Sequence, residues 1–257
     1  MERLVAIASA AIVVVAVGVG CDARLGHPAG TSADSNNPGG TSDSGGGSGS
    51  GANDAAAAAC ATGRVVYLEF EGATITQAAT ASDATQSKAV WMGVGSATLP
   101  KFRPNAADRA TQIAEVVSLI KQKLSVAPEI TVVTTRPAAG PYFMVGFGGA
   151  HQTVNVPYLY AVNRLDCGDT ATKNDLAWVF EDSPTTQKTA DFAVGSILFG
   201  LGATGTTNTT DCMCGWLTNC QPSNTACTVS PAISAALSCP NQTNPQNEVS
   251  ILHSFCQ

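Results

Sequence analysis

The chain has 257 residues, enough for one large domain or two small ones, and charged side chains make up 12% of it, about half of the ~25% usual in soluble domains. This composition excludes a highly charged disordered protein. The 13 Lys and Arg residues against 19 Asp and Glu residues give a formal charge of −6 without any basic run, so we expect no nucleic-acid partner.

The first 20 residues are predicted to be an export signal peptide. A charged start, MER, precedes an uninterrupted run of apolar or small residues at 4–19, which is shorter than the ~20 residues that a membrane-spanning helix needs. The segment Gly18-Val19-Gly20-Cys21 resembles the lipobox of bacterial lipoproteins, in which the cysteine is lipidated and becomes the mature N-terminus. We therefore expect an exported protein of the cell envelope, anchored to a membrane through Cys21, in the periplasm or on the cell surface. Because lipoboxes usually carry Leu or another larger aliphatic residue where this chain has Gly18, ordinary cleavage after Gly20 is the alternative.

Residues 21–59 are predicted to comprise the lipid-anchor cysteine and a disordered linker. From residue 28 to residue 59 the chain is built mainly of Gly, Ser, Ala, Asn, Thr and Asp, with no aromatic or large aliphatic side chain to bury. A random chain of ~30 residues reaches roughly 30 Å, so this segment is expected to hold a folded domain away from the membrane. The domain itself is assigned to residues 60–257, a size typical of one domain.

The first half of this domain is predicted to contain a strand, a loop and a long helix. Residues 65–70 combine β-branched and aromatic side chains, which is typical of a strand. A glycine-containing loop is expected up to Pro100, and Asn105 with Asp108 resembles a helix capping box. Apolar residues then recur as on one face of a helix of about five turns: Ile113, Val116, Val117, Ile120 and Leu124.

Further strands are predicted in the second half. Residues 130–135 and 142–147 are strand candidates joined by the turn-rich residues 136–141, a spacing that favours an antiparallel hairpin over a parallel crossover. Residues 158–162 and 176–180 are two more strand candidates.

A second helix is predicted to begin with Ser183 as the N-cap and Pro184 at the first helical position, and to end at Gly200 and Gly202. Its apolar face consists of Ala190, Ala193, Val194, Ile197, Leu198 and Leu201. Residues 249–255 are a candidate for a short third helix. This order of elements predicts an α+β fold, in which a mixed sheet carries two main helices and a cysteine-rich C-terminal tail.

The cysteines of the domain are expected to form disulfides. The chain has 9 cysteines, and if Cys21 is lipidated an even set remains, which is normally paired in the oxidising compartment of an exported protein. This set is Cys60, Cys167, Cys212, Cys214, Cys220, Cys227, Cys239 and Cys256. The connectivity stays open, because eight cysteines allow roughly 100 pairings. In a protein cleaved without lipidation, the alternative is four bridges and one free cysteine.

Three segments are similar to a group of exported metallopeptidase-like proteins of predatory or soil bacteria: residues 130–137, 142–149 and 166–169. The order of strand, long helix, strands, second helix and tail also resembles the zincin plan, an α/β/α-like arrangement. In those proteins the second helix carries the zinc-binding pattern HExxHxxGxxH, followed by an Asp-x-Met turn beneath the metal. Here Gly200 aligns with the glycine of that pattern, and the Asp-Cys-Met sequence at 211–213 aligns with the methionine turn.

The zinc-binding groups themselves are absent from the aligned positions. Ala193 and Ile197 stand where the two helix histidines belong, Val194 at the general-base glutamate and Ala203 at the third histidine. The motif works because residues four apart share one helix face, so two imidazoles reach one Zn²⁺ while the carboxylate activates a water. Alkyl side chains do neither, and shifting the alignment by one or two residues restores no site. We therefore expect no catalytic residue, no bound metal and no cofactor, with Met213 as a space-filling residue below the helix.

Other metal sites find little support in the sequence. The histidines are His27 in the linker, His151 and His253, and no two of them share a helix face. Isolated histidines of this kind are usually surface or loop residues. Cys212-x-Cys214 has the wrong spacing for a zinc knuckle, so disulfides are the better interpretation of these cysteines.

Two other catalytic candidates are weak. Ser196 follows Gly195 but lacks the flanking glycine pattern of a nucleophile elbow, so we expect a small packing residue on the second helix. Glu69 and Glu71 lie two apart on a strand and would share one face, as paired catalytic carboxylates do, but a solvated strand end is the favoured interpretation.

The preferred hypothesis is a zincin-like pseudoenzyme, a non-catalytic lipoprotein that serves as a binding or structural protein of the cell envelope. Its expected partners are a membrane and a peptide or protein ligand, since an extended peptide can add to an edge strand without being hydrolysed. The alternative is an active metallopeptidase or other hydrolase with an unrecognised site. The first hypothesis predicts that Ala193, Val194 and Ile197 are buried against the sheet, where an active enzyme keeps a solvent-filled cleft.

Overall fold

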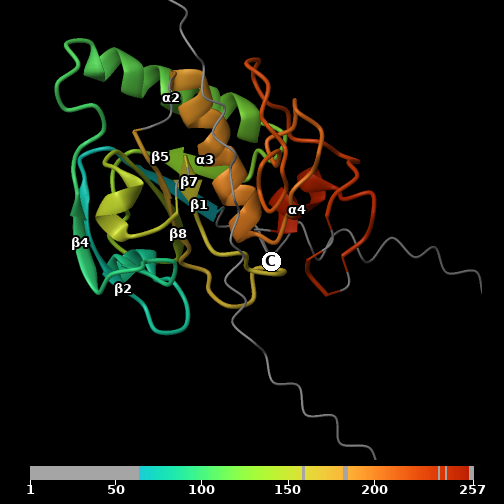
Figure 1. The fold of residues 1–257 in the computed structure, drawn as a ribbon, viewed down its shortest axis with the longest axis horizontal. Coiled ribbons are helices and arrows are strands. Elements are labelled where there is room, and N and C mark those ends of the chain that lie inside the picture. Colours follow the sequence, from blue (N-terminus) through green and yellow to red (C-terminus); the bar gives the residue numbers. More distant parts are fainter. Residues whose placement is uncertain (1–63, 158–159, 182–184, 237, 241, 255–257) are drawn as a thin grey trace, which may run out of the picture. The chain divides into compact units, whose positions relative to one another are not determined.

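The computed structural model of the chain describes residues 64–254 apart from 158–159, 182–184, 237 and 241 (Figure 1). Within these residues the fold is α+β, with helices α2 (Arg109–Leu124), α3 (Thr186–Gly200) and α4 (Glu248–Ser254) and two mixed sheets. None of the helices described is both long and apolar enough to span a membrane. The predictions for the signal peptide, for Cys21 and for the linker lie outside the described residues.

The central sheet has five strands in the order β5-β1-β6-β8-β7. Their bounds are Ile130–Val133, Arg64–Glu69, Tyr142–Phe147, Leu176–Val179 and Ala161–Val162, respectively. The first four strands run parallel, and β7 runs antiparallel to β8. Every residue of β6 and β8 is buried, which explains why both are unbroken apolar runs rather than alternating ones.

The predicted hairpin between residues 130–135 and 142–147 is wrong. In the structure β5 and β6 lie on opposite sides of β1, and both run parallel to it. The connection through residues 134–141 reaches roughly 26 Å when extended, enough to return along a short strand. Arg136 fixes its path by donating hydrogen bonds to the hydroxyl of Tyr142 at 2.8 Å and to the carbonyl of Ala84 at 2.6 Å. The central position of β6 in the sheet therefore agrees with its apolar sequence. The short connection between β5 and β6 did not make them neighbours.

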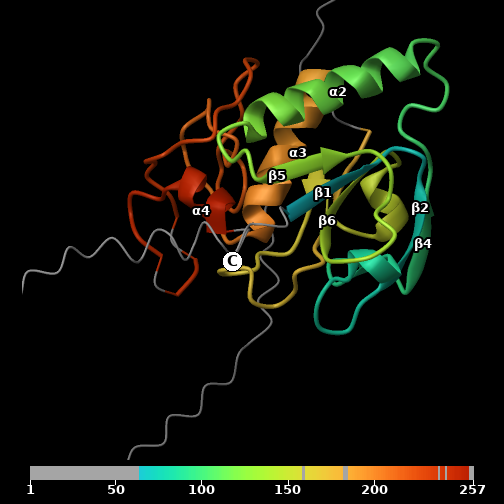
Figure 2. The same ribbon diagram turned by 180° about the vertical axis from the view of Figure 1, so that it is seen from behind.

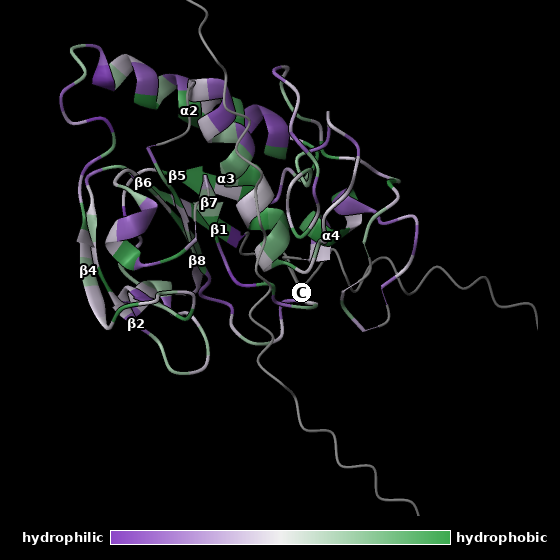
Figure 3. Cartoon of the chain, in the orientation of Figure 1, coloured by the Kyte–Doolittle hydropathy of each residue, from purple (hydrophilic) through white to green (hydrophobic). Residues whose placement is uncertain are grey.

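Two apolar layers cover the two faces of the central sheet. On β1, Val66 and Leu68 point into the layer beneath α2 and α3, whereas Tyr67 points into the opposite layer. Figures 1 and 2 show α2 and α3 together on one face of the sheet. In Figure 3 the green of apolar residues predominates in the C-terminal part of α3, whereas α2 carries many hydrophilic residues along its length. The apolar layer between the central sheet and α3 is called the main core below.

A small sheet covers the opposite face of the central sheet. It consists of β3 (Lys88–Ala89), β2 (Ala73–Gln77) and β4 (Ser96–Leu99), with β2 antiparallel to β4 and parallel to β3. The sequence between the first strand and Pro100 indicates only a loop, so this prediction missed the small sheet. These strands contain few large apolar residues, and the buried Ile75 and Leu99 gain their stability by packing on the central sheet.

The helices lie close to their predicted positions, but both predicted N-caps differ. Helix α2 begins at Arg109, and the Asp108 carboxylate accepts a hydrogen bond from the Gln112 side chain at 2.7 Å instead of forming a capping box. Helix α3 begins at Thr186, and the hydroxyl of Thr185 caps it by accepting a hydrogen bond from the Lys188 backbone at 3.1 Å. Ser183 and Pro184, the predicted start, lie outside the described residues. The short C-terminal helix is confirmed as α4.

The C-terminal region is cross-linked by disulfides, as predicted. The pairs are Cys167–Cys239, Cys212–Cys227 and Cys214–Cys220. Cys60 and Cys256 lie outside the described residues. The first pair ties the loop before β8 to the tail, while the other two fold the tail on itself beside α3.

Candidate functional site

The five positions aligned with the zinc motif are all buried in or beside α3. Ala193, Val194, Ile197, Ala203 and Met213 each have 0% of their surface exposed and belong to the main core. Burial of the helix face at the first three positions is as the pseudoenzyme hypothesis predicted. Hydrocarbon therefore occupies the helix face on which a zinc site would be built.

The C-terminal tail packs directly on α3. A Cβ added at Gly195 would lie 2.4 Å from Nε1 of Trp216 and 2.6 Å from the carbonyl oxygen of Cys212, so only glycine permits this approach. Trp216 also packs on Phe199, with ring centroids 4.9 Å apart. The Ser196 hydroxyl donates to the Phe192 carbonyl at 2.8 Å and is fully buried, consistent with a packing residue.

The Asp-Cys-Met segment forms a tight turn under this tail. Oδ1 of Asp211 accepts a hydrogen bond from the Met213 backbone at 2.8 Å, and the Cys214 backbone donates to the Asp211 carbonyl at 3.1 Å. A Zn²⁺ ion requires nitrogen, sulfur or oxygen donors. The aligned positions offer alkyl groups and one buried thioether, and the neighbouring cysteines are oxidised. The residues present do not fit a zinc ion.

A buried ion pair links α2, α3 and the tail. Nζ of Lys123 lies 2.9 Å from Oδ1 of Asp191, with 8% and 7% of the two side chains exposed. The same oxygen accepts hydrogen bonds from the Gln187 side chain at 2.9 Å and the Cys227 backbone at 3.3 Å. Lys123 also donates to the Cys227 carbonyl at 2.7 Å. These contacts fasten the tail to both helices, a structural role that the apolar periodicity of α3 gave no reason to expect.

A surface depression lies beside this ion pair. It is lined by Lys188, Asp191, Phe192, Thr209, Asp211, Cys212, Cys214, Pro222, Thr225 and Cys227. Of its two carboxylates, Asp191 pairs with Lys123 through Oδ1 while its buried Oδ2 has no hydrogen-bond partner among the described residues, and Asp211 is held by its own turn and by the Ser230 hydroxyl at 2.5 Å.

A pair of buried carboxyl groups joins α4 to the same turn. Glu248, at the start of α4, is fully buried and accepts a hydrogen bond from the Ser230 backbone at 2.9 Å. Burial, followed by the neighbouring Asp211, raises the pKa of Glu248 well above its ordinary value. The raised pKa favours the neutral form of the Glu248 carboxyl group at this buried position.

The two histidines of the domain lie apart from α3. His151 is in the short helix η2 (His151–Val154) and is only 5% exposed, with its ring 6.3 Å from that of Phe180. The prediction of an ordinary surface or loop histidine is therefore wrong for His151, because the layer behind the sheet encloses it. His253 is exposed, and its Nδ1 lies 2.5 Å from Oε1 of Glu129. Within the described residues, neither histidine joins a group of three close metal ligands.

The paired glutamates at the end of β1 have separate partners. The carboxylate of Glu71 is 60% exposed and lies 3.0 Å from Lys101 and 2.9 Å from Arg109, which lower its pKa. Glu69 accepts hydrogen bonds from the Glu71 backbone at 2.6 Å and from the Tyr67 hydroxyl. The exposure of Glu71 fits the solvated strand end that was favoured.

One acidic group was missed by the sequence analysis. Asp166, Asp169 and Asp175 are the single group of three potential metal ligands that the described part of the chain brings together. Their spacing, Asp-x2-Asp-x5-Asp in a loop with glycine, is the signal that could have revealed them. They lie in the loop between β7 and β8, next to the C-terminal end of α3.

No family model and no curated protein matches this chain. The fold and the side chains around α3 are therefore the observations that bear on its function. Together they show that the face of α3 at Ala193, Val194 and Ile197 is packed into the main core.

Proposed function

We propose that this protein is a non-catalytic, zincin-like lipoprotein of the cell envelope that acts as a binding or structural protein. One observation carries the proposal: α3 presents Ala193, Val194 and Ile197 to a closed core at the positions aligned with a zinc motif. An active zinc enzyme needs two imidazoles and a carboxylate on that face, together with an open coordination position. The tail packed on Gly195 further closes this region.

The order of elements supports the zincin-like part of the proposal. Apart from the small sheet inserted between β1 and α2, a strand, a long helix, further strands and a second helix follow one another as in the resemblance, and an Asp-x-Met turn comes after the second helix. The disulfides support export, because such bonds persist in oxidising compartments. The lipid anchor at Cys21 rests on the sequence alone.

Metal analysis combined with an activity assay tests the proposal. The exported protein, purified and incubated with an excess of Zn²⁺ and then desalted, is expected to retain far less than one zinc per chain. It is also expected to leave a mixed peptide library uncleaved. One tightly bound zinc with peptide cleavage would establish the alternative, an active metallopeptidase, and end the proposal. Cleavage without zinc would instead establish another hydrolase.

Lipidation is tested separately at the mature N-terminus. Mass spectrometry of the membrane fraction is expected to find a lipidated Cys21, and Cys21→Ser is expected to release the protein from the membrane. An unmodified N-terminus at residue 21 would establish ordinary signal cleavage.

A peptide or protein ligand is the partner that this fold suits best. The two edge strands of the central sheet are β5 and β7, and both residues of β7 are buried, whereas Thr131 of β5 is exposed. Strand β5 is therefore the edge we propose for an added peptide strand. Binding to a peptide library that β5 substitutions abolish is the expected result, and no detectable binding would leave a structural role only.

A further inference from the structure

Three carboxyl groups are buried together in the loop that leads into β8. Asp166, Asp169 and Asp175 are 4%, 2% and 2% exposed, and one oxygen from each lies within 4.8 Å of the others. Two ligands on opposite sides of one Ca²⁺ ion are about 4.8 Å apart, because each Ca–O distance is about 2.4 Å. The three carboxylates are therefore close enough to share one ion.

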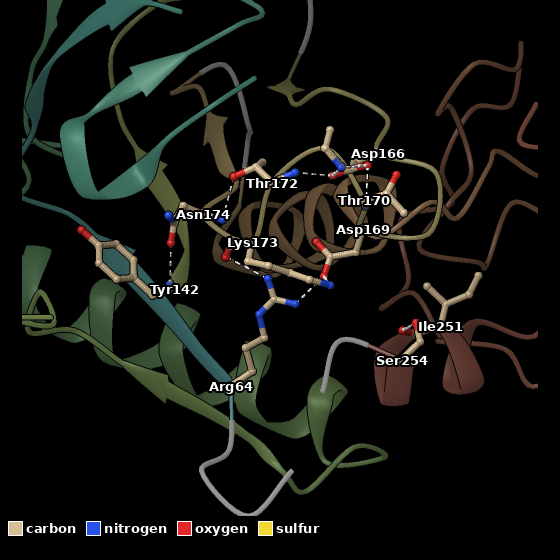
Figure 4. Close-up of polar contacts among 11 residues, drawn as sticks. Arg64, Tyr142, Asp166, Asp169, Thr170, Thr172, Lys173, Asn174, Ile251 and Ser254 are labelled. Carbon is tan, nitrogen blue, oxygen red and sulfur yellow. Dashed lines mark hydrogen bonds and ion pairs between the residues drawn. The ribbon is translucent and has the colours of Figure 1, made fainter. Parts of the chain in front are cut away.

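The loop is held in shape independently of any ligand. The Asp166 carboxylate accepts hydrogen bonds from the backbone of Thr170, Ala171 and Thr172 at 3.0–3.1 Å (Figure 4). The disulfide Cys167–Cys239 ties the same loop to the tail. A preformed loop lowers the cost of binding an ion, because less chain has to be ordered.

The positive groups near the cluster do not satisfy all of its oxygens. Arg64 and Lys173 both donate to Oδ2 of Asp169, Lys173 at 2.6 Å (Figure 4). Three buried side-chain oxygens among the described residues have no hydrogen-bond partner, and two of them, Oδ1 of Asp169 and Oδ2 of Asp175, belong to this cluster; the third is Oδ2 of Asp191. Buried polar atoms are nearly always paired, so two unpartnered carboxylate oxygens in one cluster call for an explanation.

We infer that Asp166, Asp169 and Asp175 form a binding site for one divalent cation, and that the cation is Ca²⁺. A ligand set made only of oxygen atoms suits hard cations. Mg²⁺ usually keeps several of its waters, whereas these carboxylates are almost completely excluded from solvent. Ca²⁺ accepts a larger and less regular set of oxygens, and exported proteins meet it at high concentration. The site is distinct from α3, and only the choice of Ca²⁺ rests in part on the proposed export.

Lys173 is the group that a bound cation would compete with. Its side chain is 46% exposed, whereas that of its partner Asp169 is 2% exposed. The ammonium group can therefore move into solvent as the ion binds, while Arg64, with 8% of its side chain exposed, stays in place. Removing the Lys173 ammonium group is therefore expected to raise Ca²⁺ affinity, whereas removing one of the carboxylate ligands is expected to lower it.

Ca²⁺ binding to the full-length exported protein, stripped with EGTA, tests the inference. Isothermal titration with CaCl2 is expected to show one site per chain. At a Ca²⁺ concentration of about 100 times Kd, the unfolding midpoint should rise by about 5–10 °C. Equal concentrations of Mg²⁺ should give a much smaller rise. Tb³⁺, used as a Ca²⁺ substitute, should give emission sensitised by Trp91, whose indole donates to the Leu176 carbonyl at 2.7 Å, next to Asp175.

Three variants make the test specific. Asp175→Asn should unfold in EGTA at or above the temperature of the unsubstituted protein, because it removes an unpartnered buried carboxyl, yet lose Ca²⁺ affinity at least tenfold. Lys173→Met should gain several-fold in affinity. Asp108→Asn, the same change at an exposed residue of the α2 N-terminus, should bind Ca²⁺ unchanged.

Several results would overturn the inference. One is an unfolding midpoint that stays the same in Ca²⁺ and in EGTA. This would mean that a proton rather than a metal ion neutralises the cluster. Others are equal effects of Mg²⁺ and Ca²⁺, or a Ca²⁺ response that survives in Asp175→Asn. If that variant fails to fold, the gain expected for Lys173→Met decides the question, and unchanged affinity there would also count against the site.

Discussion

A glutamate at position 194 would test whether the α3 face belongs to a core or to a cleft. Val194 is fully buried, and the zinc motif would place its general-base glutamate there. Val194→Glu loses the burial of a valine side chain, worth about 2 kcal/mol. It also forces a larger side chain into a packed space, which costs about 1–3 kcal/mol. The buried carboxyl adds a further penalty, so we expect a total loss on the order of 5 kcal/mol.

Such a loss would be a large part of the stability of a domain, which is usually about 5–15 kcal/mol. Urea unfolding followed by circular dichroism measures it, with the disulfides intact. The loss should be smaller at pH 5 than at pH 8, because a protonated carboxyl is cheaper to bury than a carboxylate. Ala114→Glu, at an exposed position of α2, is the matched control and should change stability by less than about 0.5 kcal/mol.

A small effect of Val194→Glu would refute the reasoning. If the variant lost less than about 1 kcal/mol and behaved like the control, position 194 would face water. The region above α3 would then be an open cleft, and the enzyme alternative would become the better account of the chain.

Two further predictions concern the C-terminal region. Because the pKa of Glu248 is raised, the folded state holds a proton that the unfolded state releases, so stability should fall as the pH rises from about 5 to 8, by up to about 1.4 kcal/mol per pH unit. Urea unfolding of Glu248→Gln across this range should show a flatter dependence, and an unchanged slope would contradict the assignment. Replacing the pair Cys167–Cys239 by serines should cost about 4 kcal/mol, against about 2 kcal/mol for Cys214–Cys220, because the two close loops of 72 and 6 residues. Equal losses in thermal unfolding would contradict this loop-length argument.

Much of the helical structure was predictable because it depends on local periodicity. The apolar residues of α2 recur along one face, and those of α3 continue to Gly200, where the helix ends. The strand order was not predictable from the length of the connection between β5 and β6. A connection as long as residues 134–141 can either form a hairpin or cross over β1 to a parallel strand. The small sheet was missed because short strands such as Lys88–Ala89 form only on an existing core.

At the candidate site, only the lack of zinc-binding side chains on α3 was predictable from the sequence. The alkyl groups at the aligned zinc positions could be read directly, and their burial followed from the periodicity of the helix. The acidic cluster was harder to see, because Asp166 and Asp175 meet through the folding of a loop rather than through a helix face. Likewise, nothing in the sequence around Asp191 indicated Lys123 as its partner.

The packing of the tail on α3 has a consequence for biogenesis. Gly195 is covered by Trp216 and Cys212, which belong to the last fifth of the chain to be synthesised. Until they arrive, the hydrocarbon of α3 is sheltered on one side only and is open to self-association. A premature stop before residue 212 should therefore yield an aggregating or degraded product rather than a shorter functional one.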